Sequence, residues 1–262
     1  MQLIAPVYGG INLEDISAPR CFEVEARLRE LLDIPVFHDD QHGTAIVVLA
    51  ALRNALKLVK KDLNSVKIVL SGVGAAGNAI ARLLTLNGAS NIIGFNINGV
   101  IHHEMNADDP MQQWFIEHSN PHNFKGSISE AMAGADVFIG VSAPNVLTES
   151  DVASMAKGSI VFALANPDPE IDPAVARKYA AVVATGRSDQ PNQINNVLAF
   201  PGIFRGLLDA NAHKISDQML VAAAEAIADC VSPEQLNTSF IVPSVFDPNV
   251  VKAVAAAVKK SV

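Results

Sequence analysis

The 262-residue chain has few cysteines, few aromatic residues and no long hydrophobic run. Its two cysteines, Cys21 and Cys230, are too few for the disulfide framework of a small secreted domain, which favours a reducing compartment such as the cytoplasm. The longest apolar runs, such as residues 45–52, are far shorter than the roughly 20 residues that cross a bilayer, and no signal-peptide pattern follows Met1. We therefore expect no membrane partner.

Basic residues are scarce relative to acidic ones. The chain has 19 Lys and Arg against 27 Asp and Glu, which gives a formal net charge of −8. Such a surface repels phosphate backbones, so we expect no nucleic-acid partner, and an anionic substrate would need a local cation. Hydrophobic residues make up 50% of the chain, which is enough for a large buried core and excludes an extended disordered protein.

Short apolar segments alternate with helical patterns along most of the chain. The first helix is expected from Ser17 to Asp33, and Thr44 can cap a second helix that ends near Lys61. Strands are expected at residues 34–37, 66–70, 91–96, 135–141, 159–165 and 181–185, and the region from Phe200 to Val262 is mainly helical. This alternation predicts an α/β fold: a doubly wound, mostly parallel sheet with helices on both faces and a helical C-terminal tail that packs back on it.

A glycine-rich turn follows the strand expected at residues 66–70 and opens a helix. Gly72, Gly74 and Gly77, with Ala75 and Ala76 between them, have the G-x-G-x-x-G spacing. The first glycine permits a tight turn, the second lets the backbone approach a pyrophosphate, and the third allows close helix packing. Unpaired N–H groups at the helix N-terminus then bind the anion. The turn predicts a Rossmann-type dinucleotide site, and the alternative is a purely structural strand–helix turn.

Asn96 ends the next strand, where an acidic residue usually binds the adenine ribose. Its amide can hydrogen-bond a ribose hydroxyl but lacks the carboxylate that repels a 2′-phosphate, and no lysine or arginine stands nearby. The cofactor is therefore NAD or NADP, with a slight preference for NAD. We divide the chain into a lead-in segment at residues 1–43, an NAD(P)-binding domain at 44–200 and a helical tail at 201–262.

Two acidic pairs flank the first expected helix. Glu14 and Asp15 precede it, and Asp39 and Asp40 follow it, both in irregular segments. Hard divalent cations prefer carboxylate oxygens, so the pairs indicate a metal site if they converge. Alternatively, the first pair is solvated or interacts with the helix dipole, and the second pair caps the helix that begins near Thr44.

Several motifs in one order resemble those of the malic enzymes, most closely the short bacterial form. They are GGINLED at 9–15, PVFHDDQHGT at 35–44, the glycine turn at 72–77, ANPDPE at 165–170, and TGRSD at 185–189 continuing through NQINNV to FPG at 200–202. The resemblance implies oxidative decarboxylation of L-malate to pyruvate and CO₂ with reduction of NAD or NADP, assisted by Mg²⁺ or Mn²⁺. It also implies a homo-oligomer.

The resemblance also assigns roles position by position. It implies that Glu14, Asp15 and Asp40 are metal ligands and that Asp39 is a supporting or catalytic carboxylate. Further implied contacts are substrate binding by Asn166 and Asn196, and cofactor binding by Ser142, Ala143 and Asn195. Without the resemblance, the Asn-Pro-Asp-Pro run at Asn166 would be interpreted as a turn.

One part of the family pattern is missing. The catalytic lysine and tyrosine of the family lie upstream of the motif that begins at Gly9, where this chain has only eight residues, and neither Tyr8 nor Tyr179 has the matching context. We therefore expect this chain to be the cofactor and metal half of a malic enzyme, poorly active alone, whose N-terminal half is absent or encoded separately. Alternatives are an inactive nucleotide-binding regulatory or scaffold module, or another NAD(P)-dependent hydroxy- or amino-acid dehydrogenase.

Overall fold

A six-stranded sheet organises the computed structural model, which describes residues 1–107 and 109–262. In spatial order the strands are β5 (Gly99–Val100), β4 (Ile92–Asn96), β3 (Ile68–Ser71), β6 (Val137–Gly140), β7 (Ile160–Ala163) and β8 (Val182–Thr185). Neighbouring strands are parallel except β5, which pairs antiparallel with β4. From the central strand β3 the chain forms β4 and β5 on one side of the sheet and then β6, β7 and β8 on the other side. This order is the doubly wound arrangement. The predicted α/β class is confirmed.

Helices cover both faces of this sheet, so its strands are apolar throughout. Successive residues alternate between faces: Ile68 and Leu70 join the larger core cluster, whereas Val69 joins the smaller one. The larger cluster includes residues of α2 (Thr44–Val59), α3 (Ala75–Leu86), α4 (Pro110–His118), α8 (Phe200–Asp209), α9 (Asp217–Asp229) and α10 (Pro248–Lys260). The smaller cluster includes residues of α5 (Ile128–Met132), α6 (Glu149–Ala153) and α7 (Pro173–Ala176).

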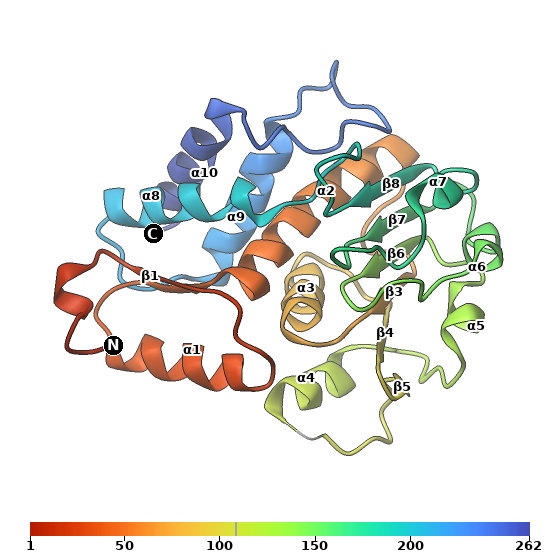
Figure 1. Ribbon diagram of the computed structural model, residues 1–262, viewed down its shortest axis with the longest axis horizontal. Coiled ribbons are helices and arrows are strands. Elements are labelled where there is room, and N and C mark those ends of the chain that lie inside the picture. The colour runs from red at the N-terminus through yellow and green to blue at the C-terminus, as the bar shows by residue number, and fades with distance from the viewer. Residues whose placement is uncertain (108) are drawn as a thin grey trace.

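The long helix α2 lies between the main sheet and the C-terminal helices α8, α9 and α10 (Figure 1). The continuous segment Asp39–Val59 is long and apolar enough to cross a membrane by length and composition, although 67% of its most apolar window is buried inside the protein. Asn54, in the middle of α2, donates its amide to the carbonyl oxygens of Ala228 and Ile241, both at 2.9 Å. This segment is therefore the core helix of the domain.

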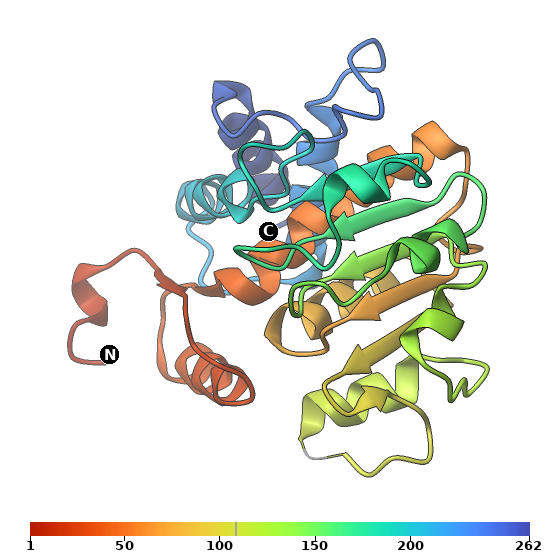
Figure 2. The same cartoon turned by 45° about the vertical axis from the view of Figure 1, so that its right-hand side comes forward.

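A second, two-stranded sheet lies near the N-terminus. Strands β1 (Ile11–Leu13) and β2 (Val36–His38) pair in parallel and are connected by α1 (Arg20–Leu31), while the short helix η1 (Ala5–Val7) precedes them. Leu13 pairs with His38, so the two strands end at the same edge of this sheet. The unit lies on the side of the molecule to which the arrowheads of the main sheet point (Figure 2).

The segment after β2 forms a π-helical turn, η2 (Asp39–Gly43), which runs directly into α2. The sequence predicted a polar turn closed by a Thr44 cap, with Asp39 and Asp40 as alternative caps. Those capping predictions are wrong: Thr44 is the first residue of α2, and no side chain caps this helix. The reason is that the backbone N–H of Thr44 already donates to Asp39 O within the continuous helix.

Candidate functional site

The glycine-rich turn connects β3 to α3. Gly72 has φ of 95°, and a Cβ there would lie 2.5 Å from the carbonyl oxygen of Val141. A Cβ on Gly77 would overlap the carbonyl oxygen of Gly72, whereas a Cβ on Gly74 would meet nothing within 4 Å. The fold therefore needs glycine at the first and third positions, and the second glycine leaves the turn open to a ligand.

A cavity of about 500 Å³ lies next to this turn. It is at the carboxyl ends of the main-sheet strands, which is where open α/β sheets bind their ligands. Six residues that the sequence predicts for the site line it: Asp40, Ala76, Ser142, Asn166, Asn195 and Asn196. The structure thus brings together one candidate metal ligand, three of the candidate cofactor contacts and both candidate substrate amides.

The two acidic pairs converge because β1 and β2 end side by side. Each pair directly follows one of these strands, and the backbone N–H of Asp15 donates to Asp40 Oδ2 at 2.9 Å. Asp15 has φ of 55°, and the Glu14 carboxylate accepts a 2.7 Å hydrogen bond from Asn12. The two acidic pairs therefore lie close together at the ends of β1 and β2, while their role as metal ligands stays a prediction.

Asp39 is the most buried of these carboxylates, with 5% of its surface exposed. Its Oδ2 accepts a 2.9 Å hydrogen bond from Nδ2 of Asn196, the first residue of the short helix η3 (Asn196–Leu198). Its buried Oδ1 has no hydrogen-bond partner among the described residues. A Cβ on Gly43 would overlap this Oδ1, so the glycine makes room for the carboxylate. The sequence did not indicate that role for Gly43.

Burial raises the pKa of Asp39 to about 6, and the negative charges of Glu14 and Asp40 act in the same direction, against the Asn196 hydrogen bond. Neighbouring carboxylates and an unpartnered buried oxygen fit the oxygen-donor chemistry that Mg²⁺ or Mn²⁺ prefers. Among the described residues, however, no group of three His, Cys, Asp or Glu side chains is gathered closely enough to hold a metal ion. Glu14, Asp15 and Asp40 stay predicted ligands.

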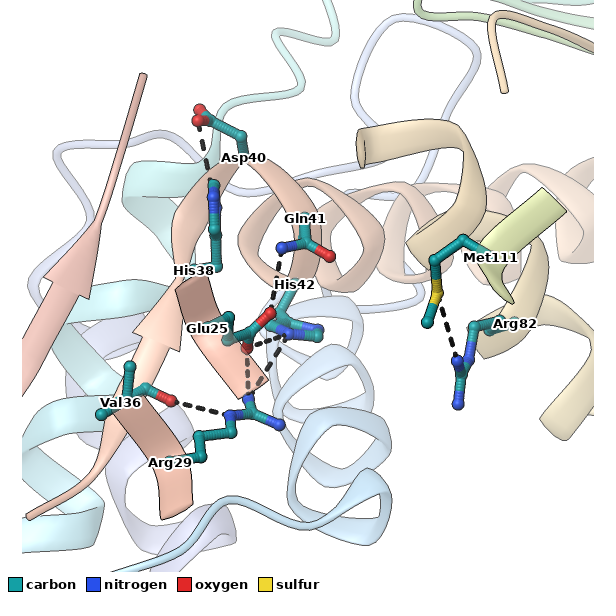
Figure 3. Close-up of polar contacts among 9 residues, drawn as sticks. All are labelled: Glu25, Arg29, Val36, His38, Asp40, Gln41, His42, Arg82 and Met111. Carbon is teal, nitrogen blue, oxygen red and sulfur yellow. Dashed lines mark hydrogen bonds and ion pairs between the residues drawn. The ribbon is translucent and has the colours of Figure 1, made fainter. Parts of the chain in front are cut away.

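A polar cluster behind η2 holds the turn against α1. Glu25 is only 6% exposed. Its carboxylate accepts hydrogen bonds from Gln41 Nε2 at 2.9 Å and His42 Nε2 at 2.7 Å, and it forms an ion pair with Arg29 Nη2 at 2.7 Å (Figure 3). Because a carboxylate can only accept, Nε2 of His42 carries the hydrogen. Neighbouring His38 is fully buried, its Nδ1 lies 4.0 Å from Asp40 Oδ2, and burial lowers its pKa. Sequence reasoning missed Glu25.

Two predicted cofactor contacts lie outside both the glycine turn and the group that lines the cavity. Ala143 is exposed in the loop after β6. Asn96 ends β4 and opens the short turn to β5, where its Oδ1 accepts a 2.8 Å hydrogen bond from the N–H of Asn98. Their roles stay predictions.

The doubly wound sheet, the glycine turn at its centre and the cavity at its carboxyl edge define a Rossmann-type dinucleotide-binding domain. The family described as "Malic enzyme, NAD binding domain" matches residues 41–262, and the chain belongs to this family.

Known malic enzymes are similar in sequence to nearly the whole of this chain. It is 58% identical to an NAD-dependent malic enzyme of Geobacillus stearothermophilus and 50% identical to a bifunctional malic/malolactic enzyme of Bacillus subtilis, covering 98% and 100% of this chain but 54% and 64% of those proteins. The crystal structure of an NAD-dependent malic enzyme from Thermotoga maritima matches with a TM-score of 0.93 at 44% identity, over 98% of this chain and 68% of that one. The chain thus spans little more than half to two thirds of these relatives.

Proposed function

We propose that this chain forms the cofactor- and metal-binding part of a malic enzyme, which converts L-malate to pyruvate and CO₂ with reduction of NAD. The observation that carries the proposal is the cavity in which Asp40, Asn166 and Asn196 meet beside the glycine turn. NADP is the alternative cofactor. Asn96 supports NAD only weakly, because it offers neither a carboxylate that excludes a 2′-phosphate nor a cation that attracts one.

In the proposed reaction, C2 of malate is oxidised to a ketone: bound NAD would accept the hydride from C2, and the C2 hydroxyl would lose its proton. The C3–C4 bond then breaks, CO₂ leaves, and a proton added at C3 gives pyruvate. A divalent cation, when bound, polarises the C2 oxygen and stabilises the negative charge left by CO₂. Glu14, Asp15 and Asp40 are the residues that would hold it, and Asp39, fixed by Asn196, supports them.

The other roles belong to neutral groups of the chain. The amides of Asn166 and Asn196 can donate to a substrate carboxylate without adding charge. The glycine turn would receive the pyrophosphate, Ser142 would line the nicotinamide side, and Asn195, which lines the same cavity, would contact the cofactor. Held together in one cavity, these groups would orient C2 toward the cofactor.

We further propose that the proton-transfer groups lie in a part of the enzyme that these 262 residues do not include, and that the enzyme is a cytoplasmic homo-oligomer. The share of the relatives that the chain covers supports the first part, and the free thiols of Cys21 and Cys230 are compatible with a reducing compartment. The 262-residue chain should therefore bind NAD but turn over malate poorly. Robust malate-dependent NADH formation by this chain alone would contradict the division of roles.

Calorimetry on the purified chain tests the binding assignments. Titration with NAD should give saturable binding, and Mn²⁺ should bind at a site that Asp40→Asn weakens by at least tenfold, because one charged oxygen ligand is lost. The exposed Asp229→Asn is the matched control and should leave both affinities unchanged. Unaltered Mn²⁺ affinity in Asp40→Asn would refute the ligand assignment, and the absence of NAD binding would refute the proposed function.

A further inference from the structure

Glu170 is a carboxylate buried beneath the cavity. Its exposure is 0%, and it is not among the residues that line the cavity. Burial raises its pKa, although hydrogen bonds from the backbone of Ser142 and Ala165 act in the opposite direction. Burying a carboxylate is costly unless it is well hydrogen-bonded, so the hydrogen-bond partners of its two oxygens indicate its structural role.

Each oxygen of Glu170 serves a different loop. Oε1 accepts from the backbone N–H of Ser142 at 2.9 Å and from the Ser142 hydroxyl at 3.3 Å. Oε2 accepts from the backbone N–H of Ala165 at 3.0 Å. Ser142 lies in the loop after β6, and Ala165 directly precedes Asn166 in the loop after β7. One side chain therefore joins the two loops that carry Ser142 and Asn166 into the cavity.

The hydrogen-bonded chain continues to the glycine turn. Ser142 Oγ lies 2.8 Å from Ser71 Oγ, and Ser71 is the last residue of β3, directly before Gly72. Since the Ser142 hydroxyl donates its single hydrogen to Glu170, the Ser71 hydroxyl must donate to Ser142. A continuous chain of polar contacts thus runs from Ser71, at the end of β3, to the backbone of Ala165, which directly precedes Asn166.

The fold makes space for this carboxylate. Gly140 ends β6, and a Cβ there would overlap the carboxyl carbon of Glu170. The backbone is fixed as well, since the N–H of Leu147 donates to Glu170 O at 3.0 Å and the N–H of Asn145 donates to Pro169 O at 3.2 Å. Glu170 is therefore held in a slot between β6 and the loop that follows it.

We propose that Glu170 is a positioning residue that sets where Ser142 and Asn166 stand in the cavity relative to the glycine turn. The inference rests on the proposed function, in which Ser142 contacts the nicotinamide side and Asn166 contacts substrate. Glutamine cannot replace this carboxylate, because its amide nitrogen would face one of the two backbone N–H donors. The loss of position affects the nicotinamide half of the cofactor and leaves the adenine half bound as before.

The experiment compares the wild-type chain with Glu170→Gln by calorimetry, using NAD and ADP-ribose, which lacks the nicotinamide. Losing one charge-assisted hydrogen bond should raise the Kd for NAD about tenfold. The Kd for ADP-ribose should change less than about twofold, on the same scale. Glu149→Gln is the matched control: Glu149 is exposed on α6, pairs with Lys178 at 3.1 Å, and should change neither affinity.

Hydrogen exchange of the Ser142 and Ala165 amides, measured by NMR without ligand, provides a second readout. Both amides should exchange faster in Glu170→Gln, while amides within β6 and β7 keep their protection. An NAD affinity within twofold of wild type, or equal losses for NAD and ADP-ribose, would overturn the inference. If the wild-type chain binds neither ligand, the proposed function fails, and unchanged exchange at these two amides would then separately overturn the role of Glu170.

Discussion

Glu25 provides a direct test of how the candidate site is held, because its carboxylate joins α1 to the turn that carries Asp39 and Asp40. Replacement by glutamine keeps the shape but removes the charge, and the amide nitrogen must then face another donor, such as Gln41 or Arg29. The side chain of Glu25 is 8% exposed, so water cannot easily replace the lost contacts.

The magnitude follows from the three partners of Glu25. The hydrogen bonds from Gln41 and His42 are buried or partly buried and involve a charge, which makes each worth about 1.5–3 kcal/mol, whereas glutamine retains one acceptor. Arg29 is 36% exposed, so its ion pair adds at most about 1 kcal/mol. We expect Glu25→Gln to lower the free energy of unfolding by about 2–4 kcal/mol at pH 7.

The pH dependence has a defined sign. Burial raises the pKa of Glu25, but the His42 hydrogen bond and the charges of His42 and Arg29 outweigh it and hold the pKa below its ordinary value of 4.5. The ionised carboxylate therefore stabilises the fold above pH 4.5, and this contribution is lost as the pH falls through the folded-state pKa. The difference between wild type and Glu25→Gln should shrink correspondingly in acid.

Urea unfolding followed by circular dichroism at pH 7 and at lower pH measures both effects. Glu23→Gln is the matched control on the same helix, because Glu23 and its partner Arg27 are 71% and 69% exposed. The control should stay within about 0.5 kcal/mol of wild type. If Glu25→Gln also stays within that limit at pH 7, the Glu25 cluster does not stabilise the turn.

Three further substitutions separate binding from folding. Gly74→Ala should weaken NAD binding about tenfold or more in calorimetry, because the new Cβ would stand where the pyrophosphate approaches the backbone. The chain should stay folded, since this Cβ meets no protein atom within 4 Å, and an unchanged affinity would place the pyrophosphate elsewhere. Gly77→Ala should instead lower the urea midpoint, with a loss of about 1–3 kcal/mol from overpacking, and a wild-type midpoint would contradict this reading of the turn. Asn192→Ala should cost about 2–4 kcal/mol of unfolding free energy, since its amide donates to Val183 O at 2.9 Å and Thr238 O at 2.8 Å; a loss below about 0.5 kcal/mol would contradict it.

Local patterns predicted the parts of the fold that depend on local geometry. The strands at residues 66–70 and 91–96 and the glycine turn between strand and helix are present within one or two residues of their predicted bounds. Apolar periodicity and glycine spacing are fixed by neighbours along the chain, so they are visible without tertiary structure. The same reasoning failed at Thr44, because a polar run that is typical of a turn instead forms a π-helical turn continuous with α2.

The supporting carboxylates could not be found in this way. Glu25 looks like any charged residue on an amphipathic helix, and its importance depends on the pairing of β1 with β2, which brings Gln41 and His42 back to α1. Glu170 lies within a recognised motif, but its function depends on the space at Gly140 and on the adjacency of β6 and β7. Both roles depend on contacts between distant segments.

The candidate metal and cofactor groups belong to two different sheets, and α2 fixes their separation. Asp40 lies in the π-helical turn that opens this helix, while Thr44 and Val47 of the helix itself line the cavity beside Ser142. A rigid helix buried between the main sheet and the C-terminal helices therefore connects the two sets of groups. A flexible loop in its place would let the distance between them vary. Cavity-forming substitutions deep in α2, such as Leu52→Ala, should consequently lower stability and disturb both sets together.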